Sequence, residues 1–172
     1  MHLVHWRTVL CLAAALTVAG DVSAQRRPAG ITPQEVKVGA AIALTVAGTP
    51  YRFSGQAVCE HLSRGSIYDV AAARWSVRHS EAGRDLSLTV WRPQSGGDDM
   101  VTLAVNIKGT RYDVNTVKAP RAPSAVGSGT VTFAPEGKGG TFTINATAGS
   151  GASITGTVKC DAFTTSAAVA GN

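Results

Sequence analysis

Arginine and tryptophan side chains gather in the middle of the chain, and their chemistry points to an anionic ligand. Guanidinium groups bind carboxylates and phosphates through paired hydrogen bonds and stack on aromatic rings. In an extended strand Arg74 and Arg78 face away from Trp75, while Trp91 precedes Arg92 on a second strand. We take Arg74, Arg78, Trp91 and Arg92 as a candidate binding surface for an anionic polysaccharide, lipid headgroups or an acidic protein. The commoner alternative is a solvated face whose arginine stems cover Trp75.

Motifs for a catalytic nucleophile or a metal centre are absent from the sequence. The serine within 127–129 lacks the pattern of a nucleophile elbow, and Glu60-His61 lacks the second histidine of a zinc motif. Asp98-Asp99 lacks the spaced oxygen ligands of a calcium loop. We therefore predict no metal or cofactor and favour a non-enzymatic role. A hydrolase with dispersed residues is one alternative, and its sign is His61 or His79 within hydrogen-bond reach of both a serine and an acid.

The first 24 residues have the order of a secretory signal peptide. Arg7 precedes the apolar stretch 9–19, and small residues at 22–24 suit cleavage after Ala24. The apolar stretch is shorter than the about 20 residues of a membrane span, and no later stretch comes closer. We predict an extracytoplasmic protein, periplasmic or secreted, without a transmembrane segment. Nucleic acid is not an expected partner at that address.

Removing the predicted signal peptide takes one of the three cysteines, Cys11, which lies too early to be a lipoprotein cysteine. The remaining pair, Cys59 and Cys160, predicts one disulfide in an oxidising compartment. Such a bond closes a loop on the order of 100 residues, for which the chain-entropy model gives about 4.7 kcal/mol.

Alternation of apolar and polar residues recurs from residue 40 onward, which is typical of strands with one buried face. About eight or nine short strands with glycine-rich turns predict an all-β, antiparallel β-sandwich, with a small β-barrel as the alternative. A barrel would suit a carrier of an apolar ligand, with a cavity lined by Phe53, Leu88, Leu103 and Phe142. The segment 66–74 has partly helical spacing, and a short helix and a loop both remain open there.

One domain accounts for the mature chain. We expect an N-terminal segment at 25–38, partly disordered, the β-domain at 39–163 and a flexible tail at 164–172. The formal net charge of the chain is +5. A positive net charge favours association with anionic partners such as an envelope component or an acidic protein.

Two patches carry a resemblance to a known family. The stretch from Gly127-Ser128-Gly129 to Lys159-Cys160, and the early segments at 46–48 and 53–55 before Cys59, are similar to parts of small secreted bacterial β-proteins. The mycobacterial small lipoprotein antigens are the nearest such family. The resemblance implies a disulfide-closed cell-envelope sandwich and no catalytic residues. This chain departs from the family in having no lipoprotein cysteine and in its tryptophan-rich middle.

Overall fold

The computed structural model describes residues 35–165. The predicted signal peptide lies outside these residues, as do parts of the predicted N-terminal segment and C-terminal tail. All regular structure in the described part is β-strand. The ten strands are β1 (Lys37–Val46), β2 (Thr49–Ile67), β3 (Val70–Glu81), β4 (Arg84–Pro93), β5 (Met100–Ile107), β6 (Thr110–Asn115), β7 (Ser128–Glu136), β8 (Gly139–Thr147), β9 (Ser153–Cys160) and β10 (Thr164–Thr165).

Nine of these strands form one antiparallel sheet in the order β6-β5-β4-β3-β2-β1-β9-β8-β7, and β10 pairs with β2 in parallel. The sheet wraps back so that its two terminal strands approach each other, which makes it nearly a closed barrel. The prediction of an antiparallel all-β fold is confirmed. Of the two architectures considered, the barrel-like one describes the sheet, because no break separates it into two sheets.

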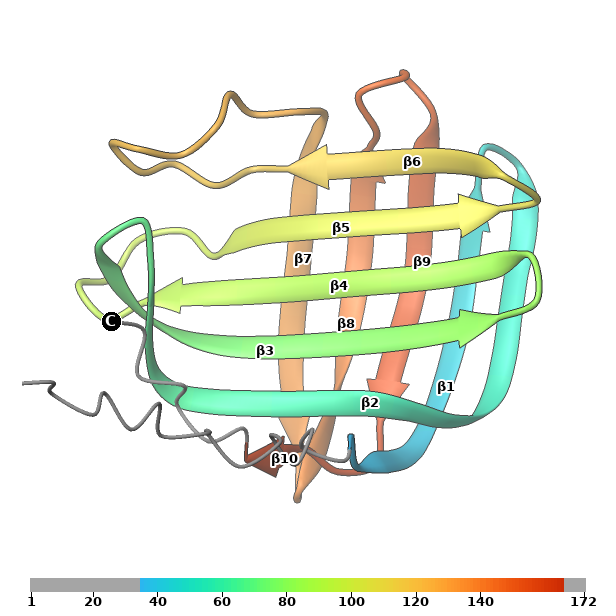
Figure 1. The fold of residues 1–172 in the computed structure, drawn as a ribbon, viewed down its shortest axis with the longest axis horizontal. Coiled ribbons are helices and arrows are strands. Elements are labelled where there is room, and N and C mark those ends of the chain that lie inside the picture. The colour runs from blue at the N-terminus through green and yellow to red at the C-terminus, as the bar shows by residue number, and fades with distance from the viewer. Residues whose placement is uncertain (1–34, 166–172) are drawn as a thin grey trace, which may run out of the picture. The chain divides into compact units, whose positions relative to one another are not determined.

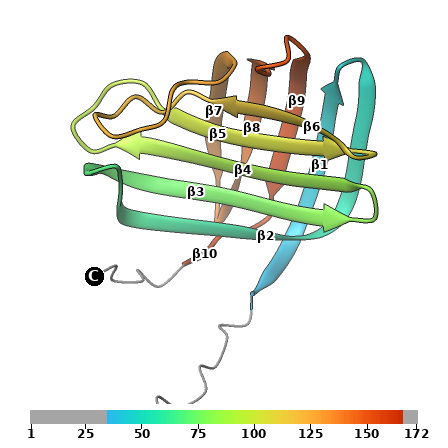
Figure 2. The ribbon, with the colours of Figure 1, turned by 45° about the horizontal axis from the view of Figure 1, so that its top comes forward.

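The sheet folds into two layers because β2 belongs to both of them. Residues 49–58 of β2 pair with β1, and residues 58–67 pair with β3, so Val58 has a partner on each side. Figures 1 and 2 show the second part of β2 and β3 to β6 running crosswise over β1, β9, β8 and β7. A bend in one long strand thus replaces the break that a sandwich would have needed.

The core lies between these layers and follows the alternation of the sequence. Along β1, the side chains of Ile42, Leu44 and Val46 are buried, and the residues between them are more exposed. The same period of two places alternate residues of β4, β5 and β8 in the core. Burial of these apolar side chains is the main stabilising term.

The segment 66–74 forms neither a helix nor an irregular loop. β2 continues to Ile67, and Tyr68 and Asp69 make a two-residue turn into β3. Both turn residues have positive φ, 46° and 68°, as the right-handed twist of a tight hairpin requires. The partly helical spacing misled the sequence interpretation because Ile67 and Val70 flank this turn as paired strand residues.

The predicted disulfide between Cys59 and Cys160 is present and closes a separation of 101 residues. Cys59 lies on β2 just beyond the bend, and Cys160 ends β9. Both cysteines are fully buried. The bond therefore ties the two layers together across the beginning of β1, which lies between β2 and β9 in the sheet.

The outer edge of β6 is bonded only over a short stretch, to residues just before β7 and just after β8, which we call the β6 seam. It consists of two hydrogen bonds between the backbones of Asn115 and Val126, at 2.7 and 2.9 Å, and one from the Gly149 N–H to the Asp113 carbonyl at 3.0 Å. Val126 precedes β7, so the seam ends where β7 begins. Beyond the seam the two strands diverge.

Candidate functional site

The hollows in the surface of the described residues include two with the volume of a ligand site. The larger has a volume of about 930 Å³ and lies along β7, and we call it the β7 groove. The smaller, about 450 Å³, lies on the outer face of the layer formed by β2 to β5, and we call it the outer hollow. Ligand pockets in proteins typically have volumes of about 300–1,000 Å³, so both hollows have room for a ligand.

The β7 groove occupies the place where the sheet does not close. One wall is β7 itself, through residues 129–133, and the other is the end of β4 with the loop that leads into β5. The complete lining is Val70, Arg92, Pro93, residues 95–100, Thr116, Lys118 and residues 129–133. The groove therefore follows directly from the divergence of β6 and β7 below the β6 seam.

Apolar and aromatic side chains form the deep side of this groove. Val131 and Met100 are buried, and Phe133 is half-buried beside them. The Phe133 ring lies 5.2 Å from the ring of Trp75, centroid to centroid. Trp75 stacks on His61 at 4.6 Å with an interplanar angle of 11°. An aromatic cluster thus supports the groove from the core side.

Charged side chains line the opposite wall. Arg92 donates two hydrogen bonds to the Asp99 carboxylate, at 3.0 and 2.8 Å, and its guanidinium lies 5.3 Å from the Trp75 ring centroid. The hydrogen bonds from Arg92 to Asp99 raise the pKa of Arg92. Among residues 35–165, Lys118 and Asp98 form no ion pair. Lys118 is exposed and is therefore available to an anionic group.

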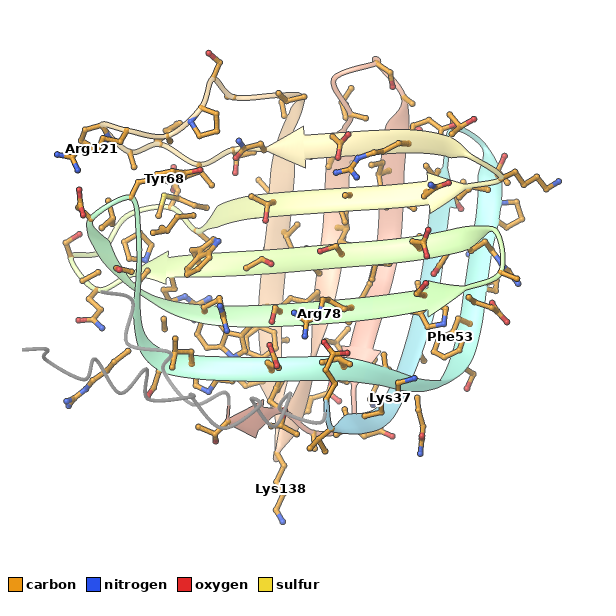
Figure 3. All side chains as sticks on the ribbon, in the orientation of Figure 1. Lys37, Phe53, Tyr68, Arg78, Arg121 and Lys138 are labelled. Carbon is orange, nitrogen blue, oxygen red and sulfur yellow. A yellow bond between two sulfur atoms is a disulfide. The ribbon has the colours of Figure 1, made fainter. Side chains whose placement is uncertain are left out.

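In the outer hollow, by contrast, most charges are already compensated. Arg78 pairs with Glu35 at 2.7 Å and with Glu60 at 3.6 Å, and Asp85 accepts a hydrogen bond from Ser80 at 2.6 Å. Figure 3 shows Arg78 near the middle of this face. Lys37 lines this hollow without an ion pair among the described residues, so charge alone does not separate the two hollows. The outer hollow is the weaker candidate because it is smaller and because β2 to β5 have a neighbouring strand on both sides.

The structure divides the four residues of the predicted binding surface between these places. Arg74 and Trp91 are cross-strand partners on the outer face, with the guanidinium 5.7 Å from the indole centroid. Arg78 lines the outer hollow, and Arg92 lines the β7 groove. Arg92 has the parity of the core residues of β4, so it lies on the opposite face from Trp91.

Trp91 carries a buried polar group without a partner. Its Nε1 is buried and makes no hydrogen bond within the described part of the chain. An unpaired buried donor costs about 1–3 kcal/mol, so Trp91 lowers stability through its N–H while its ring supports Arg74. The structure of the described residues gives no reason for this unpaired donor.

The two histidines among residues 35–165 lie against aromatic neighbours. The Tyr51 hydroxyl and His79 Nδ1 are 2.6 Å apart, and Phe53 packs on the His79 ring at 3.7 Å. Burial lowers the pKa of both His79 and His61, and it raises the pKa of Tyr51 to about 12. Within residues 35–165, neither histidine forms a hydrogen bond with a serine or an acid. The geometric sign of a hydrolase is thus missing from the described residues.

The residues expected to line a carrier cavity lie in the packed interior instead. Leu88, Leu103 and Phe142 have exposed fractions of 2% or less, and none of them lines either hollow. Phe53 is half-buried against His79. Both hollows described above therefore lie outside this packed interior.

In the part of the chain that the structure describes, no three histidine, cysteine or acidic residues converge as a metal site. The same part contains no helix with the length and apolarity needed to cross a membrane. Comparison of the chain with protein-family models, curated proteins and solved structures finds no match. The resemblance to the mycobacterial antigens stays a hypothesis based on two short patches.

Sequence reasoning missed Lys118, Phe133 and the edge of β7. Lys118 lies in a proline-containing segment between two strands, and the alternation of the sequence does not distinguish Phe133 from other inward strand residues. The free edge depends on which strand ends the sheet, and that order is set by long-range pairing. The weak signal available was a lysine three residues after the end of a strand.

Proposed function

We propose that this chain is an extracytoplasmic, non-enzymatic binding protein and that the β7 groove is its ligand site. The predicted signal peptide and the buried disulfide support the extracytoplasmic address. The observation that carries the binding role is the groove itself, where a strand edge, an apolar floor and uncompensated charge meet. Its volume of about 930 Å³ suits a ligand of several residues or sugar units.

The chemistry of the groove favours a ligand that is partly apolar and carries a negative charge. Met100, Val131 and Phe133 offer apolar contact, and Lys118 offers a charge without an ion-pair partner among the described residues. Arg92 adds a second cation that a competing carboxylate can share with Asp99. The net charge of +5 favours encounter with anionic envelope components. An envelope component or an envelope protein fits this description.

A groove-filling substitution tests the site. Ser95 is exposed, lies in the loop before β5 and lines the groove, so Ser95→Trp should obstruct it. Ser150 is an exposed loop residue that lines neither hollow, so Ser150→Trp is the matched control. The oxidised protein is mixed with a cell-envelope fraction of its source organism, and the co-sedimenting amount is measured.

We expect Ser95→Trp to lower the bound amount about tenfold, as loss of about 1.4 kcal/mol would, and Ser150→Trp to leave it unchanged. Equal binding of both variants and the wild type would place the ligand site outside the groove. Absence of sedimentation by the wild type would contradict the binding role. The N-terminal residue of the protein recovered from the extracytoplasmic fraction, expected to be Gln25, checks the address separately.

A further inference from the structure

We infer that the β7 groove binds an extended polypeptide segment, which adds to the sheet as a further strand beside β7 and places a carboxylate against Lys118. The inference rests on the proposed function, because it names the ligand class of the same groove. It begins with the free edge of β7. Within the described residues, β7 pairs only with β8, and no other backbone group bonds to residues 128–136.

In an antiparallel ladder, alternate residues direct both their N–H and their C=O groups toward the same neighbour. Half of the residues of β7 therefore present their main-chain groups away from β8. Five β7 residues, 129–133, also line the groove, so these unpaired donors and acceptors face the space that a ligand would occupy. At about 3.3 Å per residue this edge is roughly 16 Å long.

A ligand that satisfies such an edge must repeat a donor and an acceptor at the spacing of a strand. An extended polypeptide does so along its whole length, whereas a lipid chain offers neither group. Proteins bind peptides in this way elsewhere, with main-chain hydrogen bonds for affinity and alternate side chains for specificity. The groove therefore matches a peptide through its backbone, independently of any one side chain.

The surroundings of the edge determine which peptide fits. One row of the added strand's side chains would face Val131, Phe133 and Met100, so apolar residues should occupy alternate positions. The other row would face solvent and should be polar. The Lys118 ammonium group would pair with one carboxylate of the peptide. The exposed Asp98 carboxylate on the same wall would repel an acidic run, so a single acid among neutral residues fits best.

The loop before β5 limits the number of strands that can add to β7 to one. Residues 95–99 lie opposite β7 across the groove. A single added strand would lie between this loop and β7, and the loop would stop further strands from adding. Exposed edges without such a barrier tend to pair with other copies of the same chain.

The experiment uses a displayed library of random peptides of about ten residues, selected on the oxidised protein. Selected peptides are synthesised in a plain form and in a form N-methylated at alternate residues. The methyl groups remove one row of N–H donors and keep every side chain. Dissociation constants are measured for both forms, together with amide hydrogen exchange of the protein with and without the plain peptide.

We expect slower exchange at alternate amides within residues 129–133 and at least about tenfold weaker binding of the N-methylated form, because several main-chain hydrogen bonds are lost. Binding without a change at these amides would overturn the added strand. In that case, loss of peptide binding by Ser95→Trp would show that the groove still binds ligands as proposed. Failure to select any peptide would also overturn the inference, whereas the sedimentation assay tests the groove independently.

Charge reversal tests the carboxylate. Lys118→Glu should weaken the selected acid-containing peptides about tenfold, and replacing the peptide's acid by lysine should restore binding to this variant. Lys138→Glu makes the same charge change at the turn between β7 and β8, where Figure 3 shows the side chain extending away from the strands. We expect Lys138→Glu to alter binding less than about twofold. Equal effects of the two variants would overturn the role of Lys118.

Discussion

β6 and β7 are the two terminal strands of one sheet, yet only β6 has backbone partners on its outer edge among the described residues. The β6 seam uses main-chain groups of Asp113 and Asn115, which bond to Gly149 and Val126. β7 lies against a groove instead. The gap between the two terminal strands is thus closed by hydrogen bonds at the β6 seam and stays open along β7.

The difference shows how a barrel-like sheet can keep a usable edge. Free strand edges invite aggregation, and proteins normally cover, shorten or charge them. Here the loop at 95–99 limits access to β7, and Pro135 lacks an N–H near the end of the strand. The edge is therefore restricted in space but still unpaired, which is the condition for binding a single extended segment.

Removal of the disulfide should cause the largest loss of stability among these changes, while the difference between the two edges should persist. Cys59→Ala combined with Cys160→Ala opens a loop of 101 residues and should lower the free energy of unfolding by up to about 4.7 kcal/mol. Urea unfolding of the oxidised wild type and the double variant measures the loss. Since strand order sets the two edges, amide exchange should still be slower at Asn115 and Val126 than at alternate residues of 129–133. Equal exchange at both edges would show that covalent closure creates the difference.

A methyl group added at Gly127 should weaken the β6 seam. Gly127 has a φ of 68°, and an added Cβ would lie 2.3 Å from the Thr147 carbonyl oxygen, directly after the Val126 bridge. Gly127→Ala should cost about 2–4 kcal/mol through strain and overlap, and it should speed exchange at Asn115. Gly151, with a φ of 85° and open space around its Cα, supplies the control. If Gly151→Ala proves equally destabilising, overlap at the seam contributes nothing.

Changes of pH should weaken the whole fold without favouring either edge, because none of Tyr51, His61 and His79 lines the β7 groove. The lowered pKa of His79 and His61 means that the folded chain prefers the neutral rings, so this stability is complete above the ordinary value of 6.5 and is lost as the pH falls toward the lowered pKa values. The pKa of Tyr51, about 12, means that its stabilisation is complete below 10.0 and is lost between 10.0 and about 12.

Urea midpoints across both pH ranges test this pattern. Tyr51→Phe removes the phenol, so the alkaline loss should shrink in this variant compared with the wild type. It also removes the hydrogen bond with His79, so the variant should be less stable at neutral pH. An unchanged alkaline loss in Tyr51→Phe would mean that other groups cause it.

The smallest expected effects on stability come from weakening either of two ion pairs at the surface. Asp99→Asn weakens the pair with Arg92 in the groove, and Asp113→Asn weakens the pair with Arg111 beside the seam. Each should change the free energy of unfolding by less than about 1 kcal/mol. Only Asp99→Asn should increase binding of the envelope fraction, because it frees a groove guanidinium. A similar gain for Asp113→Asn would point to general charge attraction rather than to the groove.

Local patterns in the sequence were sufficient to predict most of the strands. Alternation at residues such as Ile42, Leu44 and Val46 reports which face a strand buries, and glycine at Gly109 marks a tight turn. The disulfide followed from counting cysteines. The hairpin at 68–69 was missed because neither Tyr68 nor Asp69 is a glycine, although both adopt positive φ.

The sequence by itself therefore determined the class of fold, the inward faces of the strands and the Cys59–Cys160 pair, because each depends on local chemistry or on a simple count. Only the tertiary structure decided that β2 bends into both layers, that β6 is sealed while β7 is not, and that Arg92 leaves the face of Trp91 for the groove. These features depend on which distant strands pair and in what order. A period of two is the same for every such arrangement, so it cannot distinguish one from another.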